Sequence, residues 1–145
     1  MTSRGKLASW TKWLICLAML VPAALYAAQY QQFGEVRVYY NSIRSTLIPE
    51  QVATLHGVVR ADNQALINIA IKRDSVPAQA RLSGFSTNLI NQTRRLAFIE
   101  VQEQSAIYYL ANATVGKNEI LRFTVNIEID NHAEPILLKF EQAFY

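Results

Sequence analysis

Apolar and polar residues alternate along the chain with a period of two from Phe33 onward. The clearest run is Ile120–Asp130, where one face carries apolar side chains alone: Leu121, Phe123, Val125, Ile127 and Ile129. Successive side chains of a strand point to opposite faces of its sheet, so this run predicts a half-buried antiparallel strand. The final segment, Ile136–Phe144, repeats the pattern and is predicted to be a second strand.

Five further segments have strand patterns that are less regular: Val36–Asn41, Ala65–Lys72, Ala78–Asn88, Arg95–Gln102 and Ala106–Thr114. Turn-forming residues, such as Asp62-Asn63 and Gly116-Lys117-Asn118, separate the segments at intervals of roughly ten residues. About seven short strands at this spacing predict an all-β fold, either an antiparallel sandwich or a small barrel.

The segment Pro49–Gly57 departs from the period of two. It begins with a proline suited to a first helical turn, spaces Val52 and Leu55 as a helix does, and ends in glycine. We predict a short helical turn here, lying across one end of the sandwich. No repeat, low-complexity tract or linker rich in Pro, Gly or Ser interrupts the pattern, so residues 29–145 are predicted to form a single domain.

The first 28 residues differ in kind from the rest of the chain. They carry Arg4, Lys6 and Lys12 with no acidic residue, then an apolar run from Trp13 to Val21, then a tail of small residues. This order is typical of a secretory signal peptide. We predict cleavage near Ala27 or Ala28 and a periplasmic location for residues 29–145.

An alternative is that the segment Trp13–Leu25 is retained as an inner-membrane anchor of a tethered accessory subunit. The apolar run is short compared with the ~20 residues of a spanning helix, and Pro22 ends it. The tail matches the cleavage pattern imperfectly, however, so the anchor stays open as a second interpretation.

The leader also accounts for the basic composition. Three of the fourteen basic residues and none of the eleven acidic ones lie in it, which leaves residues 29–145 with no net charge. A nucleic-acid partner is therefore excluded, because a phosphate-binding face needs a surplus of Lys and Arg. The sole cysteine, Cys16, is also in the leader, so the mature domain has no thiolate nucleophile and no disulfide.

Candidate chemistry is sparse. Asp130, His132 and Glu134 lie close together at a strand end and could bind a divalent cation, either as a metal site or as part of a metal-dependent or hydrolytic enzyme. The same residue types are ordinary in a hairpin turn. The other histidine of the domain, His56, precedes Gly57 and fits a helix end whose side chain favours the last carbonyls. No Gly-x-Ser-x-Gly motif is present.

Paired residues offer a different kind of surface. The basic pairs Lys72-Arg73 and Arg94-Arg95 could meet an acidic partner, although charges of this kind also protect strand edges from pairing. Tyr108-Tyr109 places one ring on each face of a strand, so that one ring belongs to the core and the other could belong to a recognition surface.

The order of four segments resembles a family of small exported bacterial proteins, the domain of unknown function number four-four-two-six. The segments are Gly57-Val58-Val59-Arg60, Asn88-Leu89-Ile90-Asn91-Gln92, Ala106-Ile107-Tyr108-Tyr109 and Phe140-Glu141-Gln142-Ala143-Phe144-Tyr145. The resemblance covers essentially the whole mature chain and implies an immunoglobulin-like sandwich in a Gram-negative envelope. It implies no activity. Arg60, Asn88 and Gln92 are the polar residues that coincide with the family pattern. A structural role in fixing turns suits these residues as well as a binding role does.

These observations favour a non-enzymatic module that interacts with another envelope protein and takes no cofactor. The candidate binding residues are Arg60, Asn88, Gln92, Tyr108 and Tyr109. Because binding by such sandwiches is a fold-level analogy, the metal-dependent enzyme and the tethered subunit remain alternatives. The pattern indicates no oligomeric state.

Overall fold

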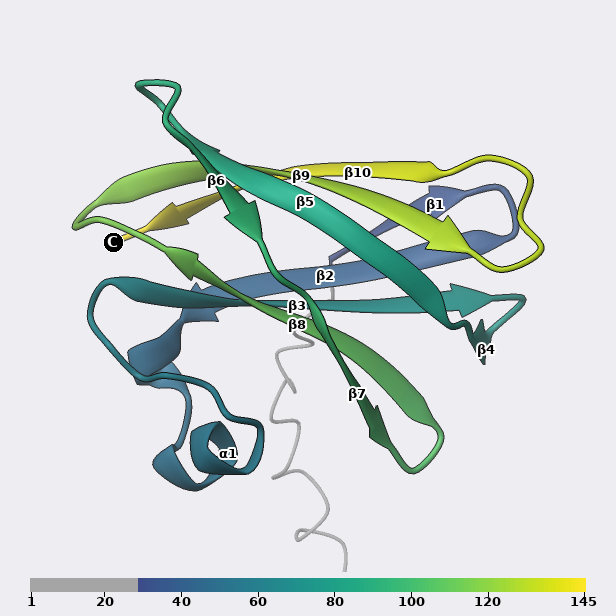
Figure 1. The fold of residues 1–145 in the computed structure, drawn as a ribbon, viewed down its shortest axis with the longest axis horizontal. Coiled ribbons are helices and arrows are strands. Elements are labelled where there is room, and N and C mark those ends of the chain that lie inside the picture. Colours follow the sequence, from purple (N-terminus) through teal and green to yellow (C-terminus); the bar gives the residue numbers. More distant parts are fainter. Residues whose placement is uncertain (1–28) are drawn as a thin grey trace, which may run out of the picture.

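The computed structural model describes residues 29–145 and divides them into ten strands with two short helical segments (Figure 1). In chain order these are β1 Tyr30–Phe33, β2 Val36–Arg44, the 3-10 turn η1 Ser45–Leu47, α1 Glu50–Leu55, β3 Gln64–Arg73, β4 Val76–Pro77, β5 Ala80–Asn88, β6 Thr93–Leu96, β7 Ile99–Glu103, β8 Ala106–Thr114, β9 Glu119–Ile129 and β10 Ile136–Phe144. The predicted signal peptide, its cleavage site and the alternative anchor all lie outside the described residues.

Two antiparallel sheets face each other, as Figure 1 shows with the smaller sheet above the larger one. The larger sheet has the order β1-β2-β3-β8-β7, with β4 paired to β3, and the smaller has the order β10-β9-β5-β6. The predicted all-β sandwich is therefore confirmed. No helix within residues 29–145 is both long and apolar enough to cross a membrane.

The core lies between the sheets and follows the period of two. All five apolar residues predicted on one face of β9 are buried, and β3 contributes Ala65, Ile67, Ile69 and Ile71 from the opposite sheet. Phe123 of β9 stacks on Phe140 of β10, which in turn stacks on Tyr40 of β2. These rings join the two sheets along one side of the sandwich.

The predicted strand Arg95–Gln102 is wrong as a single element. The chain instead forms β6 in the smaller sheet, crosses at Ala97-Phe98, and forms β7 in the larger sheet. No glycine or proline marks this crossing, and residues 96–99 are a continuous apolar run that fits a strand buried on both faces, so the sequence pattern could not distinguish two short strands from one. The pattern also missed β1 and β4, which have four and two residues.

The predicted short helix is present as α1, although its place differs from the expectation. Side chains of α1 and the following loop lie against the outward-facing side chains Leu66 of β3 and Leu110 of β8. The helix therefore covers part of the outer face of the larger sheet, below that sheet in Figure 1, rather than the opening between the sheets.

Candidate functional site

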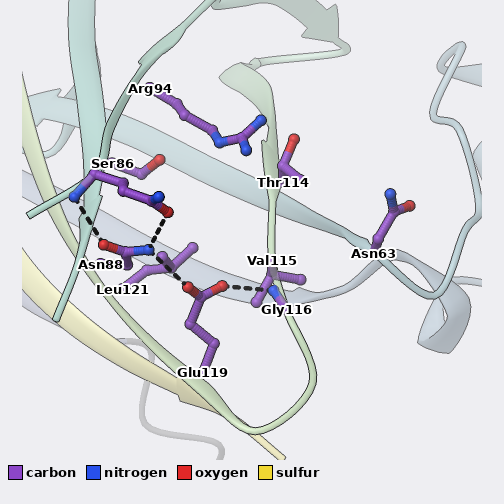
Figure 2. A pocket seen from close by; sticks show the side chains of 10 residues that line it. Asn63, Ser86, Asn88, Arg94, Thr114, Val115, Gly116, Glu119 and Leu121 are labelled. Carbon is purple, nitrogen blue, oxygen red and sulfur yellow. Dashed lines mark hydrogen bonds between the residues drawn. The ribbon is translucent and has the colours of Figure 1, made fainter. Parts of the chain in front are cut away.

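A pocket lined mostly by polar and charged residue types lies between the two sheets at one end of the sandwich, with a cavity volume of about 300 Å³ (Figure 2). The ends of β5, β6, β8 and β9 and the loop before β3 supply its walls, which are Asn63, Ser86, Asn88, Gln92, Arg94, Thr114, Val115, Gly116, Glu119 and Leu121. We call this the sandwich-end pocket. It contains Asn88 and Gln92, two of the five binding residues predicted from the sequence.

A hydrogen-bond network fixes one wall of the sandwich-end pocket. The Asn88 amide donates to Gln92 Oε1 at 2.9 Å and to Glu119 Oε1 at 3.1 Å, and Asn88 Oδ1 accepts from the backbone N–H of Gln92 at 2.8 Å. Glu119 Oε2 accepts from the backbone N–H of Gly116. Both carboxylate oxygens of Glu119 and the whole amide of Asn88 are thus engaged in holding the β5–β6 turn against the β8–β9 turn.

Arg94 is the cation of the pocket. It pairs with the buried Ser86 in the β5–β6 ladder, so it projects toward the inner side of the smaller sheet, and Figure 2 shows its guanidinium reaching across toward Thr114. The Arg94 side chain is exposed and makes no hydrogen bond or ion pair within residues 29–145. By contrast Arg73, Arg81 and Arg122 each pair with a glutamate. The pocket therefore offers five unused guanidinium donors beside side-chain amides and hydroxyls.

A second hollow adjoins the first and shares Asn63, Val115 and Gly116 with it. Its volume is about 510 Å³, and it carries Lys117 and Arg44. Arg44 donates to four backbone oxygens, those of Asp62, Gly116, Phe144 and Tyr145, at 2.9 to 3.4 Å. Asp62 lines this hollow and Glu119 lines the first, so each hollow carries acidic as well as basic side chains.

The other three predicted binding residues lie elsewhere. Arg60 donates to the carbonyl of Thr46 at 3.0 Å, a contact that fixes the loop around η1. Tyr108 is half-buried on the outer face of the larger sheet, under α1. Tyr109 belongs to the core, and its hydroxyl accepts from the backbone N–H of Ala80 and donates to Glu100. The five residues therefore do not form one surface.

The hydroxyl of Tyr109 and the carboxylate of Glu100 have opposite pKa shifts. Burial, more than the nearby negative charge, raises the pKa of Tyr109. Hydrogen bonds from Gln79, then Gln102, then Tyr109 lower the pKa of the exposed Glu100, because they stabilise its charged form. Through these hydrogen bonds Tyr109 connects Glu100 of β7 to Ala80 at the start of β5. None of these three residues lines the sandwich-end pocket.

The three residues of the predicted metal site occupy the β9–β10 turn. His132 Nδ1 lies 2.6 Å from the backbone carbonyl of Glu134. Within residues 29–145, no group of three or more His, Cys, Asp or Glu side chains is arranged to hold a metal ion. Nothing in the geometry of Asp130, His132 and Glu134 therefore supports the metal hypothesis, which stays a prediction.

Two site features were missed by the sequence pattern. His56 ends α1 as expected, but its Nε2 atom lies 3.1 Å from Glu103 Oε1 on β7, so its side chain does not serve the helix carbonyls. The pair Arg94-Arg95 was interpreted as edge protection, whereas the ladder places the two side chains on opposite faces. The alternation of a strand predicts that two neighbouring residues point to opposite faces. It does not predict the pocket toward which Arg94 projects.

Comparisons with known proteins agree with the sequence-based resemblance. The model of the family "Domain of unknown function (DUF4426)" matches residues 30–145. A crystal structure of a DUF4426 family protein from Pseudomonas aeruginosa is 30% identical and superposes with a TM-score of 0.73, covering 81% of this chain and 94% of that chain. No curated protein matches the chain.

More distant structural neighbours share the fold alone. A copper-bound variant of FetP from uropathogenic Escherichia coli is 12% identical, has a TM-score of 0.58, and covers 81% of this chain and 94% of its own. A second FetP structure, from protein expressed recombinantly in the periplasm of Escherichia coli, is 10% identical with a TM-score of 0.56, and covers 80% and 92%.

Proposed function

This chain belongs to the DUF4426 family, and from that premise we propose that its sandwich is a non-enzymatic binding module of the bacterial periplasm. Its partner is an acidic segment of another envelope protein, which binds in the sandwich-end pocket. The observation that carries the proposal is Arg94, a guanidinium directed into a polar pocket with no acidic partner within residues 29–145.

The chemistry of the pocket favours a carboxylate as the bound group. A guanidinium matches a carboxylate with two parallel hydrogen bonds, and the amides and hydroxyls around Arg94 supply further donors. The Glu119 carboxylate, the acid of the pocket, has both oxygens engaged by hydrogen bonds from Asn88 and from the N–H of Gly116. It therefore shapes the pocket more than it competes for Arg94.

The adjoining hollow favours an extended segment over a small anion. Arg94 lies in one hollow and Lys117 in the next, and the two hollows share three residues of wall. A polypeptide with acidic residues at two positions would engage both cations, whereas an isolated small anion would engage one.

The periplasmic location rests on the signal-like order of the first 28 residues. The expression of a FetP neighbour in the periplasm is in keeping with it. Osmotic shock tests the location, because a cleaved chain is released into the shock fluid and a chain anchored by Trp13–Leu25 stays with the membranes.

The binding proposal is tested with a fluorescein-labelled octaglutamate probe, followed by fluorescence anisotropy, with octaglutamine as the uncharged probe. We expect octaglutamate to bind and Arg94→Gln to weaken it by about tenfold, the loss of one charge-assisted pair. Arg95→Gln is the matched control, because it makes the same charge change on the opposite face of the same strand.

The proposal is contradicted if R94Q and R95Q weaken octaglutamate binding equally. The peptide would then be attracted by the overall charge of the protein and not by the pocket. Absence of octaglutamate binding would contradict it as well. A Lys117→Gln variant then measures whether the segment reaches the second hollow, with a smaller loss expected because the Lys117 ammonium cannot form the two parallel hydrogen bonds of a guanidinium.

A further inference from the structure

The turn between β5 and β6 exposes two large apolar side chains. Leu89 is 55% exposed and Ile90 is 74% exposed, and the two are neighbours in the chain. The β5–β6 ladder ends at the pair of Thr87 with Thr93, so residues 88–92 form a loop that projects beyond the sandwich, at the upper left of Figure 1. We call this loop the β5–β6 tip.

The polar residues of the tip are sufficient to fold it. The backbone N–H of Asn91 donates to the carbonyl of Asn88 at 3.0 Å, which closes a turn with Leu89 and Ile90 at its two central positions. Asn88 Oδ1 accepts from the N–H of Gln92 at 2.8 Å, and Asn91 takes the left-handed conformation. Gly, Pro, Asn, Asp and Ser are the usual residues of turns. Folding therefore gives no reason for two adjacent aliphatic residues here, and their exposure indicates a contact outside the chain.

The convex shape of the tip narrows the class of partner. Leu89 and Ile90 do not line the sandwich-end pocket, and a projecting pair of side chains has no walls to enclose a small ligand. A protein partner needs a cavity shaped for both side chains. The boundary between the headgroups and acyl chains of a bilayer accepts projecting apolar groups without a preformed cavity.

The charges beside the tip favour a bilayer with anionic headgroups. No acidic residue occurs between Asp74 and Glu100, a stretch that contains the whole β5–β6 hairpin. Arg94 and Arg95 follow the tip directly, and the adjacent β8–β9 turn contributes one base, Lys117, and one acid, Glu119. Bases thus outnumber acids in these two turns, and each Lys or Arg near an anionic membrane adds to the attraction.

An exposed aromatic residue lies at the same end of the sandwich. Tyr145 is 85% exposed and lines the second hollow together with Lys117, and the C-terminus lies on the same side of Figure 1 as the tip. Tyrosine is enriched where a membrane meets water, because its ring is apolar and its hydroxyl is polar. The turns at the opposite end of the sandwich carry acidic residues, among them Glu35, Asp74 and Glu134.

We propose that the β5–β6 tip docks the protein on a bilayer that contains anionic phospholipid, with Leu89 and Ile90 inserted below the headgroups and Arg95 beside the phosphates. The binding is weak and reversible, because two aliphatic side chains bury less apolar surface than a single myristoyl chain, which itself binds with a constant of about 10⁴ M⁻¹. Arg94 stays directed into the sandwich-end pocket. The membrane contact therefore goes beyond the acidic-segment site, and either one can fail without the other.

Insertion of the tip is measured by tryptophan fluorescence. Residues 29–145 contain both sheets and the core between them, and they contain no tryptophan, so this part of the chain is used. Ile90→Trp places one fluorophore at the tip, and Val76→Trp places one at a position 64% exposed at the opposite end. With vesicles of phosphatidylglycerol and phosphatidylethanolamine at millimolar lipid, we expect the emission of I90W to shift to shorter wavelength and that of V76W to stay unchanged.

The strength of binding is measured by sedimentation with the same vesicles. Ile90→Ser removes one inserted aliphatic side chain, so we expect binding to weaken about tenfold. Val76→Ser is the matched control and should bind as the unmodified protein does. Arg95→Gln should weaken binding about fivefold, the contribution of one basic residue near an anionic surface. Far-UV circular dichroism checks that the variants keep the fold.

Three results would overturn the proposal. These are absence of sedimentation with phosphatidylglycerol vesicles at millimolar lipid, equal fluorescence shifts in I90W and V76W, and binding of I90S as strong as that of the unmodified protein. A protein cavity would then be the better partner for the tip. Octaglutamate binding should be the same in I90S, because Ile90 does not line the sandwich-end pocket, and this separates failure of the tip from failure of the pocket.

Discussion

Two regions of the molecule, the sandwich end and the surroundings of α1, hold their loops against the sheets in different ways. At the sandwich end, many side-chain hydrogen bonds to the backbone fix the loops: Arg44 donates to four backbone oxygens, and Glu119 accepts from the N–H of Gly116. Around α1 there are fewer such bonds, two between the Ser45 hydroxyl and Ala61 and one from Arg60 to Thr46. The buried side chains of Ile48 and Ala53 and one histidine–glutamate pair supply the other contacts there.

This difference has consequences for both stability and binding. Directional hydrogen bonds hold the loops of the sandwich end in one geometry, as a site for a charged group requires. The six-residue α1 buries one side chain, that of Ala53, leaves Val52 and Leu55 exposed, and is expected to open more easily.

The largest expected effect comes from Arg44→Met, which keeps the length of the side chain and removes its donors. Four backbone oxygens lose a charged partner, so we expect the free energy of unfolding to fall by about 2–3 kcal/mol. Chemical denaturation measures it. Arg60→Met is the control in the α1 region, where one bond to Thr46 is lost and about 0.5 kcal/mol is expected. Equal losses would remove the distinction between the regions.

Ala53→Glu should separate the α1 region from the sheet. Ala53 is 2% exposed, so the new carboxylate would be buried without a partner, at a cost of about 2 kcal/mol. We expect local detachment of the helix instead of global unfolding, with faster hydrogen exchange confined to residues 45–60. Faster exchange in β9 as well would show that the helix is part of the cooperative core.

Glu119→Ala tests the network of the sandwich-end pocket. Removal of the carboxylate takes away the acceptor of the Asn88 amide and of the Gly116 N–H. We therefore expect the free energy of unfolding to fall by about 1–2 kcal/mol. The Asn88→Ala/Glu119→Ala double-mutant cycle should show coupling between the two residues. Additive effects would mean that the network does not act as one unit.

The smallest effect concerns Glu100 on β7. Gln79→Leu removes the hydrogen bond that contributes most to lowering the pKa of Glu100, so that pKa should rise toward its ordinary value in an NMR titration of the carboxyl group. Gln102→Leu should raise it less.

The pH dependence of stability follows from the same shift. Because the pKa of Glu100 is lower in the folded state, its contribution is present above the unfolded value of about 4.3 and is lost as pH falls through the folded value. Gln79→Leu should therefore make stability less sensitive to acid. Unchanged sensitivity would contradict the role of Gln79.

The sequence predicted well those parts of the fold where each strand has one buried face. The period of two gave the buried face of β9 residue by residue and the bounds of β8 and β10. It failed at Ala97-Phe98, because residues 96–99 are a continuous apolar run with no turn residue to mark the change of sheet. The DUF4426 resemblance was confirmed over residues 30–145.

The candidate site was predicted only in part, because it depends on which turns meet. Asn88 and Gln92 were identified, yet Glu119 and Arg94 join them only when β9 and β6 flank β5. Arg44 could not be found from sequence either, since a lone arginine at a strand end gives no sign that four carbonyls converge on it.

The most direct test of the account is an NMR titration of the whole domain with octaglutamate, which maps every amide that responds. We predict that the largest chemical-shift changes fall around both hollows at the sandwich end, at residues 63, 88–94 and 114–119, and that R94Q moves them to about tenfold higher peptide concentration while R95Q does not. Changes centred instead on the other exposed basic surface, around Arg37 and Lys72, would contradict the assignment of the acidic-segment site to the sandwich-end pocket.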